Sequence, residues 1–114
     1  MNDISMQACI DACRHCHETC LHIAMNHCLV AGGKHVEASH FRLMIDCVDI
    51  CQFSADLMLI GSIFHHRVCA TCAEICEACA KSCEQIGGME DCVKACRDCA
   101  ESCRNMAATS ILID

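Results

Sequence analysis

Sixteen of the 114 residues are cysteine, and most of them recur at intervals of three and four residues. Three segments carry such series, namely residues 9–20, 69–83 and 92–103. Because an α-helix has 3.6 residues per turn, this spacing places the thiols of each series in one stripe along one helix face. Such a stripe occupies the heptad positions that face the core of a helical bundle. The spacing therefore predicts helices whose buried side is lined by thiols instead of aliphatic side chains.

Glycines divide the chain into four segments of helical composition. Gly32 and Gly33 follow the first segment, and Gly87 and Gly88 follow the third, where glycine commonly ends a helix. A less marked break at Gly61 separates the second segment from the third. No segment alternates polar and apolar residues with a period of two, so strands are not expected. We predict one all-α domain spanning residues 1–114, an antiparallel up-down-up-down four-helix bundle with a Cys-lined core and helices at about 3–31, 36–60, 64–86 and 89–108.

The chemical state of the thiols depends on where the chain resides. A cysteine content this high in a short chain is typical of secreted disulfide scaffolds. The first residues, Met1 to Ser5, lack the basic and apolar regions of a secretory signal peptide, so we expect a cytoplasmic protein with reduced thiols. Reduced thiols at this density indicate metal or redox chemistry. The longest apolar stretch, residues 57–64, is too short to cross a membrane, and the net charge of −7 gives no basic surface for nucleic acid.

The geometry of the cysteine stripes favours copper(I). Thiols one helical turn apart have Cβ atoms about 5–6 Å from each other, and a metal–thiolate bond is about 2.3 Å long. Two such thiolates can hold one ion in a near-linear bridge, and copper(I) is a soft ion that accepts low coordination numbers. Zinc prefers four ligands at tetrahedral corners, and a continuous ladder offers few obvious closed four-sulfur cages. We therefore predict multiple Cu(I) ions per chain, about 16 if each thiolate is shared between two ions.

Helical phase selects three histidines as further ligands. His27 is predicted to lie in line with the first cysteine series, with Cys28 at its flank, and His65 lies one turn before the third series. In the second helix the inward line begins at His40 and passes through either Leu43 or Met44. The predicted metal ligands are Cys9, Cys13, Cys16, Cys20, Cys28, Cys47, Cys51, Cys69, Cys72, Cys76, Cys79, Cys83, Cys92, Cys96, Cys99 and Cys103, with His27, His40 and His65.

Two surface features follow from the same helical phase. Phe41, Ile45 and Phe53 project away from the inward line of the second helix, and an apolar outer face on a bundle helix indicates burial against another subunit. We therefore expect a homo-oligomer. The antiparallel arrangement also gathers His27 and Met89 at one end of the bundle, together with the glycines, so we expect copper to enter there.

The sequence resembles the cytosolic copper storage proteins, a family of four-helix bundles with thiols in the core. The resemblance covers nearly the whole chain and is carried by four stretches: Ala8 to Cys16, Asp46 to Cys51, Cys69 to Cys79 and Cys92 to Cys103. It implies storage of copper(I), no catalysis and a homotetramer. Family members tend to have cysteine where this chain has His40, and histidine where it has Gly87, Gly88 and Met89.

Clustered cysteines also occur in proteins with functions other than copper storage. The same thiols would bind zinc, so a zinc or general soft-metal buffer or detoxification protein is the alternative function. An iron–sulfur protein needs four converging cysteines, which loops usually supply. A thioredoxin-like redox site needs a CxxC motif beside a strand, and no strand pattern is present. The sequence shows no catalytic triad and no phosphate-binding loop, so we predict that the protein is not an enzyme.

Overall fold

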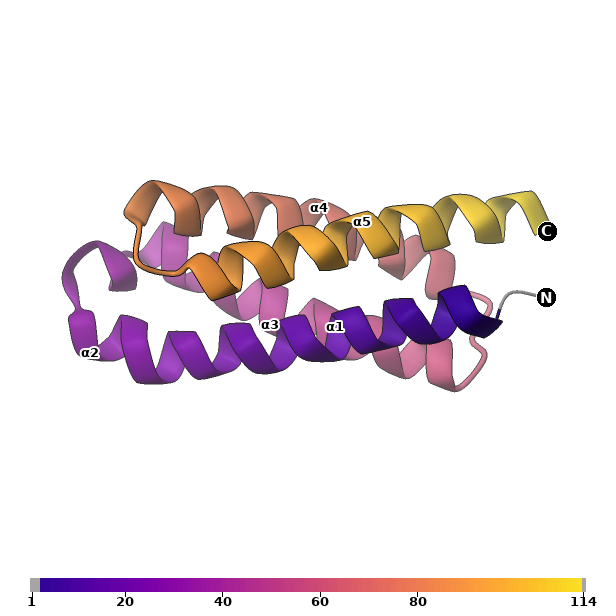
Figure 1. Ribbon diagram of the computed structural model, residues 1–114, viewed down its shortest axis with the longest axis horizontal. Coiled ribbons are helices and arrows are strands. Elements are labelled where there is room, and N and C mark those ends of the chain that lie inside the picture. The colour runs from indigo at the N-terminus through magenta and orange to yellow at the C-terminus, as the bar shows by residue number, and fades with distance from the viewer. Residues whose placement is uncertain (1–2, 114) are drawn as a thin grey trace.

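The protein folds into a bundle of antiparallel helices measuring 46 × 19 × 18 Å (Figure 1). The computed structural model describes residues 3–113, so Met1, Asn2 and Asp114 of the predicted domain lie outside the described residues. The elements are α1 (Asp3–Ile23), a π-helical turn (Ala24–Cys28), α2 (Leu29–Ala31), a 3₁₀ turn (Gly33–Val36), α3 (Ala38–Leu59), α4 (His65–Ile86) and α5 (Glu90–Ile113). Because α1, the π turn and α2 form one continuous rod, the described chain is a four-helix bundle, as predicted.

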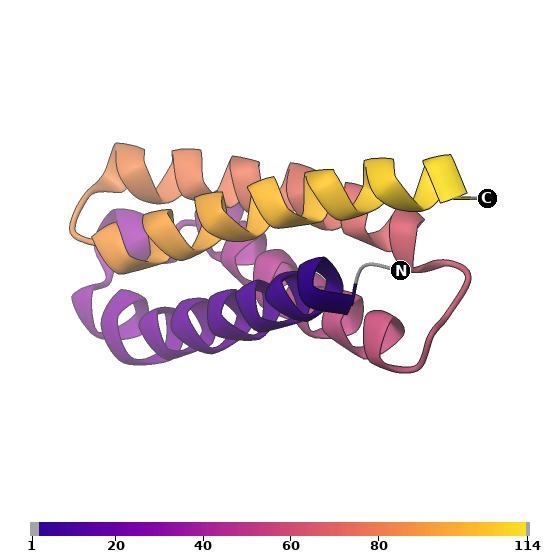
Figure 2. The same ribbon diagram turned by 45° about the vertical axis from the view of Figure 1, so that its right-hand side comes forward.

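Each helix packs against two neighbours around a common core. α1 lies against α3 and α5, and α4 lies against the same two helices from the other side (Figure 2). The turn after α2 and the turn between α4 and α5 lie together at one end, which we call the glycine end (Figure 1). The chain termini and the α3–α4 connection lie at the opposite, terminal end. Among the described residues, no helix combines the length and the apolar character needed to cross a membrane.

Glycine ends the helices at the glycine end because the backbone there enters conformations that other residues rarely adopt. Gly32 follows α2 with φ of 68° and Gly87 follows α4 with φ of 87°. Glu90 and Asp91 then occupy the first turn of α5, where negative charge favours the helix N-terminus. α5 continues to Ile113, beyond the expected end near 108.

The π-helical turn changes which residue of the first rod faces the core. A uniform α-helix would have carried His27 into line with the cysteines of α1 and left Cys28 at the flank. The turn over Ala24–Cys28 contains more residues than an α-helical turn, so the inward position moves one residue further along the chain. Cys28 is fully buried, whereas His27 is exposed. The predicted orientation of this pair was therefore wrong.

Thiols and small side chains fill the bundle. Every cysteine is buried, with at most 1% of its surface exposed. The helices approach closely because alanine occupies several flanking core positions, among them Ala24, Ala55, Ala80 and Ala100. All cysteines are free thiols, so the core holds no disulfide that would occupy a pair of them. The predicted core lined by cysteine is confirmed.

Candidate metal centre

The four helices bring their thiols together at the middle of the bundle. Cys47 of α3 has its sulfur 3.7 Å from the sulfurs of Cys16 on α1, Cys76 on α4 and Cys96 on α5. One thiol therefore contacts a thiol on each of the other three helices. Because cysteine is short, this meeting requires the close helix approach that the alanines permit.

Sulfur contacts continue from this centre towards both ends. On the terminal side, Cys51 lies 3.5 Å from Cys76, and the contacts then run through Cys99, Cys13 and Cys103 to Cys9 at separations of 3.5–3.8 Å. On the other side, they pass from Cys96 through Cys20 and Cys92 to Cys83 at separations of 2.9–3.8 Å. The thiols thus form an unbroken line of neighbours along most of the bundle, entirely shielded from solvent.

Met44 adds a thioether to this line. Its side chain is fully buried, and its sulfur lies 3.4 Å from the sulfur of Cys83 and 3.6 Å from that of Cys79. Leu43, the other candidate for this inward position, is only half-buried. The thioether is an uncharged soft donor, so it would compete poorly with thiolates for a metal ion but would not repel one.

The thiols also form compact groups that sequence spacing did not predict. Within the described residues, four sets of four sulfurs lie with all members within 4.8 Å of one another, and a fifth set has three members. The sets are Cys13, Cys72, Cys99 and Cys103; Cys16, Cys20, Cys47 and Cys96; Cys16, Cys51, Cys76 and Cys99; Cys20, Cys79, Cys92 and Cys96; and Cys9, Cys69 and Cys103. The expectation that the ladders provide few four-sulfur cages was therefore wrong, because cages form between helices.

The separations also bear on the predicted near-linear bridges. Thiols one turn apart on the same helix, such as Cys16 and Cys20 or Cys99 and Cys103, have sulfurs 3.9 Å apart. A linear bridge with bonds of about 2.3 Å needs about 4.6 Å, whereas a trigonal site needs about 4.0 Å. The observed spacing thus matches three-coordinate ions more closely, and linear bridges require the sulfurs to move apart.

Metal binding releases the thiol protons, since the thiolate is the ligand. The sulfurs of Cys20 and Cys92 are 2.9 Å apart, and the hydrogen bond from Cys20 lowers the pKa of Cys92 to about 6. Burial raises the pKa of Cys28, which therefore remains protonated until a metal ion displaces its proton. The core consequently contains both a readily ionised thiol and a reluctant one near the glycine end.

The three candidate histidines have different surroundings. His40 is buried, its Nδ1 lies 2.8 Å from the hydroxyl of Ser82, and its Nε2 is buried without a hydrogen-bond partner. Burial, followed by the nearby His35, lowers the pKa of His40, so its ring stays neutral and can offer a lone pair. His27 is exposed and packs edge-to-face on His35, with ring centroids 4.9 Å apart. His65 is half-buried, and its Nδ1 lies 2.8 Å from the Ser62 carbonyl oxygen.

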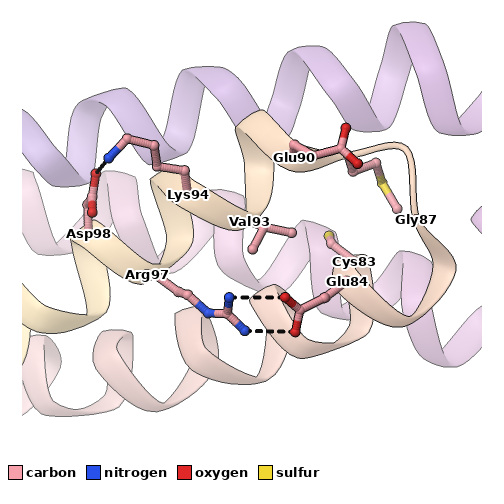
Figure 3. A pocket seen from close by; sticks show the side chains of 9 residues that line it. Cys83, Glu84, Gly87, Glu90, Val93, Lys94, Arg97 and Asp98 are labelled. Atoms are coloured by element: carbon pink, nitrogen blue, oxygen red, sulfur yellow. Dashed lines mark hydrogen bonds and ion pairs between the residues drawn. The ribbon is translucent and has the colours of Figure 1, made fainter.

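Two surface pockets approach the core at the glycine end. The first has a volume of about 460 Å³, lies between α4 and α5, and has Cys83 and Met89 among its lining residues. The Arg97 guanidinium donates two hydrogen bonds to the Glu84 carboxylate beside it, at 3.0 and 3.2 Å (Figure 3). The other, of about 310 Å³, is lined in part by His27 and Met89. Met89 is shared by both pockets and its sulfur lies 3.6 Å from that of Cys28. This methionine therefore connects the surface to the buried thiols.

Comparison with known proteins places this arrangement in a family. Residues 2–108 match the family described as "Csp: Copper storage protein". The chain belongs to the copper storage protein family. The predicted resemblance is thus confirmed, and with it the function of the core: copper(I) is stored on cysteine thiolates, and the family is not one of enzymes.

Solved structures of similar proteins superimpose along most of the chain. A crystal structure of a Nitrosospira multiformis protein is 66% identical, with a TM-score of 0.92 over 94% of this chain and 98% of that one. The Cu(I)-bound copper storage protein BsCsp3 is 39% identical, with a TM-score of 0.83 over 90% of this chain and 98% of that one. The apo form of Csp3 from Bacillus subtilis is 42% identical, with a TM-score of 0.73 over 89% and 97%.

A curated relative adds less information. The uncharacterized cysteine-rich protein YhjQ of Bacillus subtilis is 40% identical over 69 residues, and this match spans 60% of the present chain and 63% of that protein. The relationship is therefore carried mainly by the family match and by the solved structures, one of which contains Cu(I).

Proposed function

We propose that this chain stores many Cu(I) ions as a single domain, with all sixteen cysteines as ligands. The observation that carries the proposal is the continuous line of buried sulfur contacts, which runs from Cys9 to Cys83 without an intervening aliphatic side chain. Each interior thiol of this line has a sulfur neighbour on both sides, so its thiolate can bridge two ions, whereas Cys28 lies beside the line with its sulfur 3.6 Å from that of Met89. Sharing of this kind keeps the ratio near one ion per thiolate, and the loaded core then carries no net charge.

The test is an anaerobic titration of the reduced protein with Cu(I) against a competing chromophoric chelator. We expect about 16 tightly bound ions per chain. A matched variant, Cys69→Ser, removes one thiol near the terminal end and should lower the count by about one. A wild-type count of about four or fewer would contradict storage on shared thiolates and would favour separate tetrahedral sites.

We further propose that copper reaches the core at the glycine end through Met89. Met89 is buried beneath the two pockets, and its thioether is a soft, uncharged ligand that can accept Cu(I) from them and release it to thiolate. Cys28 is the adjacent thiol, and burial keeps it protonated until copper arrives. His27 lines one of the pockets beside Met89 and would assist capture, whereas the free Nε2 of His40 would serve as an inner ligand. His65 remains a candidate ligand at the terminal end.

We propose that the protein is cytoplasmic and forms a homotetramer. Free thiols in this number persist where the surroundings are reducing, which supports the location. Phe53 on the outer side of α3 is 50% exposed, and Phe41 and Ile45 on the same helix are half-buried, which supports a subunit contact there.

Sedimentation equilibrium of the reduced apo protein tests the assembly. We expect a mass of about four chains for the wild type and a smaller species for Phe53→Ser, because a hydroxyl removes apolar area from the contact. Val30→Ser on α2, at a side chain that is 81% exposed, is the matched control and should leave the mass unchanged. A monomeric wild type would refute the tetramer.

A further inference from the structure

One of the four-sulfur sets has the dimensions of a different metal site. Five of the six sulfur–sulfur distances among Cys16, Cys20, Cys47 and Cys96 are 3.9, 3.7, 3.8, 3.5 and 3.7 Å. A tetrahedral ion with about 2.3 Å bonds to four thiolates requires edges of about 3.8 Å. The sixth distance, between Cys20 and Cys47, is below 4.8 Å. These thiols therefore surround a point that suits one tetrahedral ion with little rearrangement.

We propose that, in the absence of copper, this tetrad binds one Zn(II) ion, which Cu(I) later displaces. The inference rests on the proposed function, since it concerns the same core, but it assigns a second cargo and a specific position. Zn(II) in structural sites almost always binds four ligands at tetrahedral corners, and thiolate is among its preferred donors. α1 supplies two of the ligands, α3 one and α5 one, so the ion would tie three helices together.

Charge explains why the two metals would fill the core differently. One Zn(II) and four thiols give a tetrathiolate complex of charge −2 and release four protons, whereas each Cu(I) replaces one proton and leaves the core neutral. A buried charge of −2 requires nearby donors. The thiol of Cys76 lies 3.7 Å from the sulfur of Cys47 and can donate an S–H bond to that thiolate. Cys92 lies 2.9 Å from the sulfur of Cys20 and can do the same once zinc has displaced the proton that Cys20 otherwise donates to Cys92.

Shared residues limit the zinc capacity. Cys16 belongs to two of the tetrads, as do Cys20, Cys96 and Cys99. At most two tetrads can therefore be complete at the same time, and zinc should saturate at two tetrathiolate ions per chain where copper reaches about 16. Copper displaces zinc when four Cu(I) ions bind to the four thiolates of one tetrad and one Zn(II) ion leaves, with no change in protonation.

Cobalt(II) and zinc titrations of the reduced, metal-free protein test the proposal. Co(II) in a tetrathiolate site shows intense visible bands and near-ultraviolet thiolate-to-metal charge transfer, and Zn(II) bleaches both when it replaces cobalt. We expect these signals with the first equivalent, saturation at no more than two ions, and zinc release on addition of Cu(I). Absence of the tetrathiolate spectrum, or saturation well above two ions, would overturn the proposal.

Two single variants locate the site. Cys47 belongs to this tetrad alone, so Cys47→Ser should weaken binding of the first zinc ion by at least about tenfold. Cys69→Ser, outside every tetrad, is the control and should bind it as the wild type does. Cys47→Ala repeats the test without a buried hydroxyl, and circular dichroism establishes that each variant is folded. Unchanged zinc affinity in both Cys47 variants would overturn the assignment.

The copper count on the same samples separates this proposal from the proposed function. A wild-type count near 16 together with no zinc binding would refute the zinc site alone. A count of about four or fewer would refute storage on shared thiolates, whatever the outcome of the zinc titration.

Discussion

Copper loading is expected to raise the resistance of this protein to guanidinium chloride far above that of the apo form. A ligand that binds only the folded state adds about 4.1 kcal/mol per site when its free concentration is 1,000 times its dissociation constant. Domains of this size have total unfolding free energies of about 5–15 kcal/mol, so even a few tightly bound ions would dominate the stability. All the proposed thiolate ligands lie in the core, and unfolding would separate them.

Circular dichroism in increasing denaturant measures the effect under anaerobic conditions. The apo form should unfold cooperatively, because thiols pack as modest hydrophobes and the alanine-rich helix contacts do not need metal. The loaded form should retain its helical signal at denaturant concentrations that unfold the apo form completely. A strong Cu(I) chelator should return the transition to its apo midpoint. Equal midpoints for the two forms would show that copper is bound outside the folded core.

Periodicity made the fold class predictable. Cysteine intervals of three and four have only one simple structural solution, a helix with a thiol stripe, and stripes of this kind must be buried together. The glycine pairs gave the helix ends because Gly32 and Gly87 adopt positive φ values in the structure. The inward line of α3 from His40 to Met58 could be predicted for the same reason, since α3 is a regular helix throughout.

Two features of the core could not be obtained from spacing along single helices. The π turn is a local departure from the α-helical period, and it reversed the expected roles of His27 and Cys28. The four-sulfur sets depend on the rotation and axial offset of neighbouring helices. Cys47, for example, joins a tetrad with α1 and α5 because those helices place Cys16 and Cys96 at its level. Sequence intervals contain no information on these offsets.

Met44 illustrates the limit for a single position. Helical phase left Leu43 and Met44 equally suited to the inward line, because the two directions differ by about 100° and the core-facing sector is similarly wide. The structure selects Met44, whose sulfur contacts three thiols, and leaves Leu43 at the edge of the core. Flexible methionine fits the irregular space beside these sulfurs better than branched leucine does.

Interrupting the sulfur line at mid-core is expected to divide copper loading into a fast and a slow phase. Valine cannot bind metal and is apolar, although it is larger than cysteine by about one methyl group, so replacing Cys16, Cys47, Cys76 and Cys96 by valine removes the central thiols and leaves a filled, apolar core. The thiols that remain on the glycine side are those of Cys20, Cys28, Cys79, Cys83 and Cys92. The thiols that remain on the terminal side are those of Cys9, Cys13, Cys51, Cys69, Cys72, Cys99 and Cys103. No sulfur contact observed among the described residues then joins the two groups.

Copper that enters at the glycine end would fill the first group rapidly and reach the second only by crossing an apolar barrier. The chelator signal should therefore show about five ions transferred at the wild-type rate and about seven transferred much more slowly. The control replaces Cys9, Cys13, Cys69 and Cys103 by valine, which removes the same number of thiols at the terminal end. Its remaining thiols stay connected through Cys92 to Cys83, which lines the same pocket as Met89, so it should load in one phase. A single fast phase in the mid-core variant would mean that copper also enters elsewhere along the bundle.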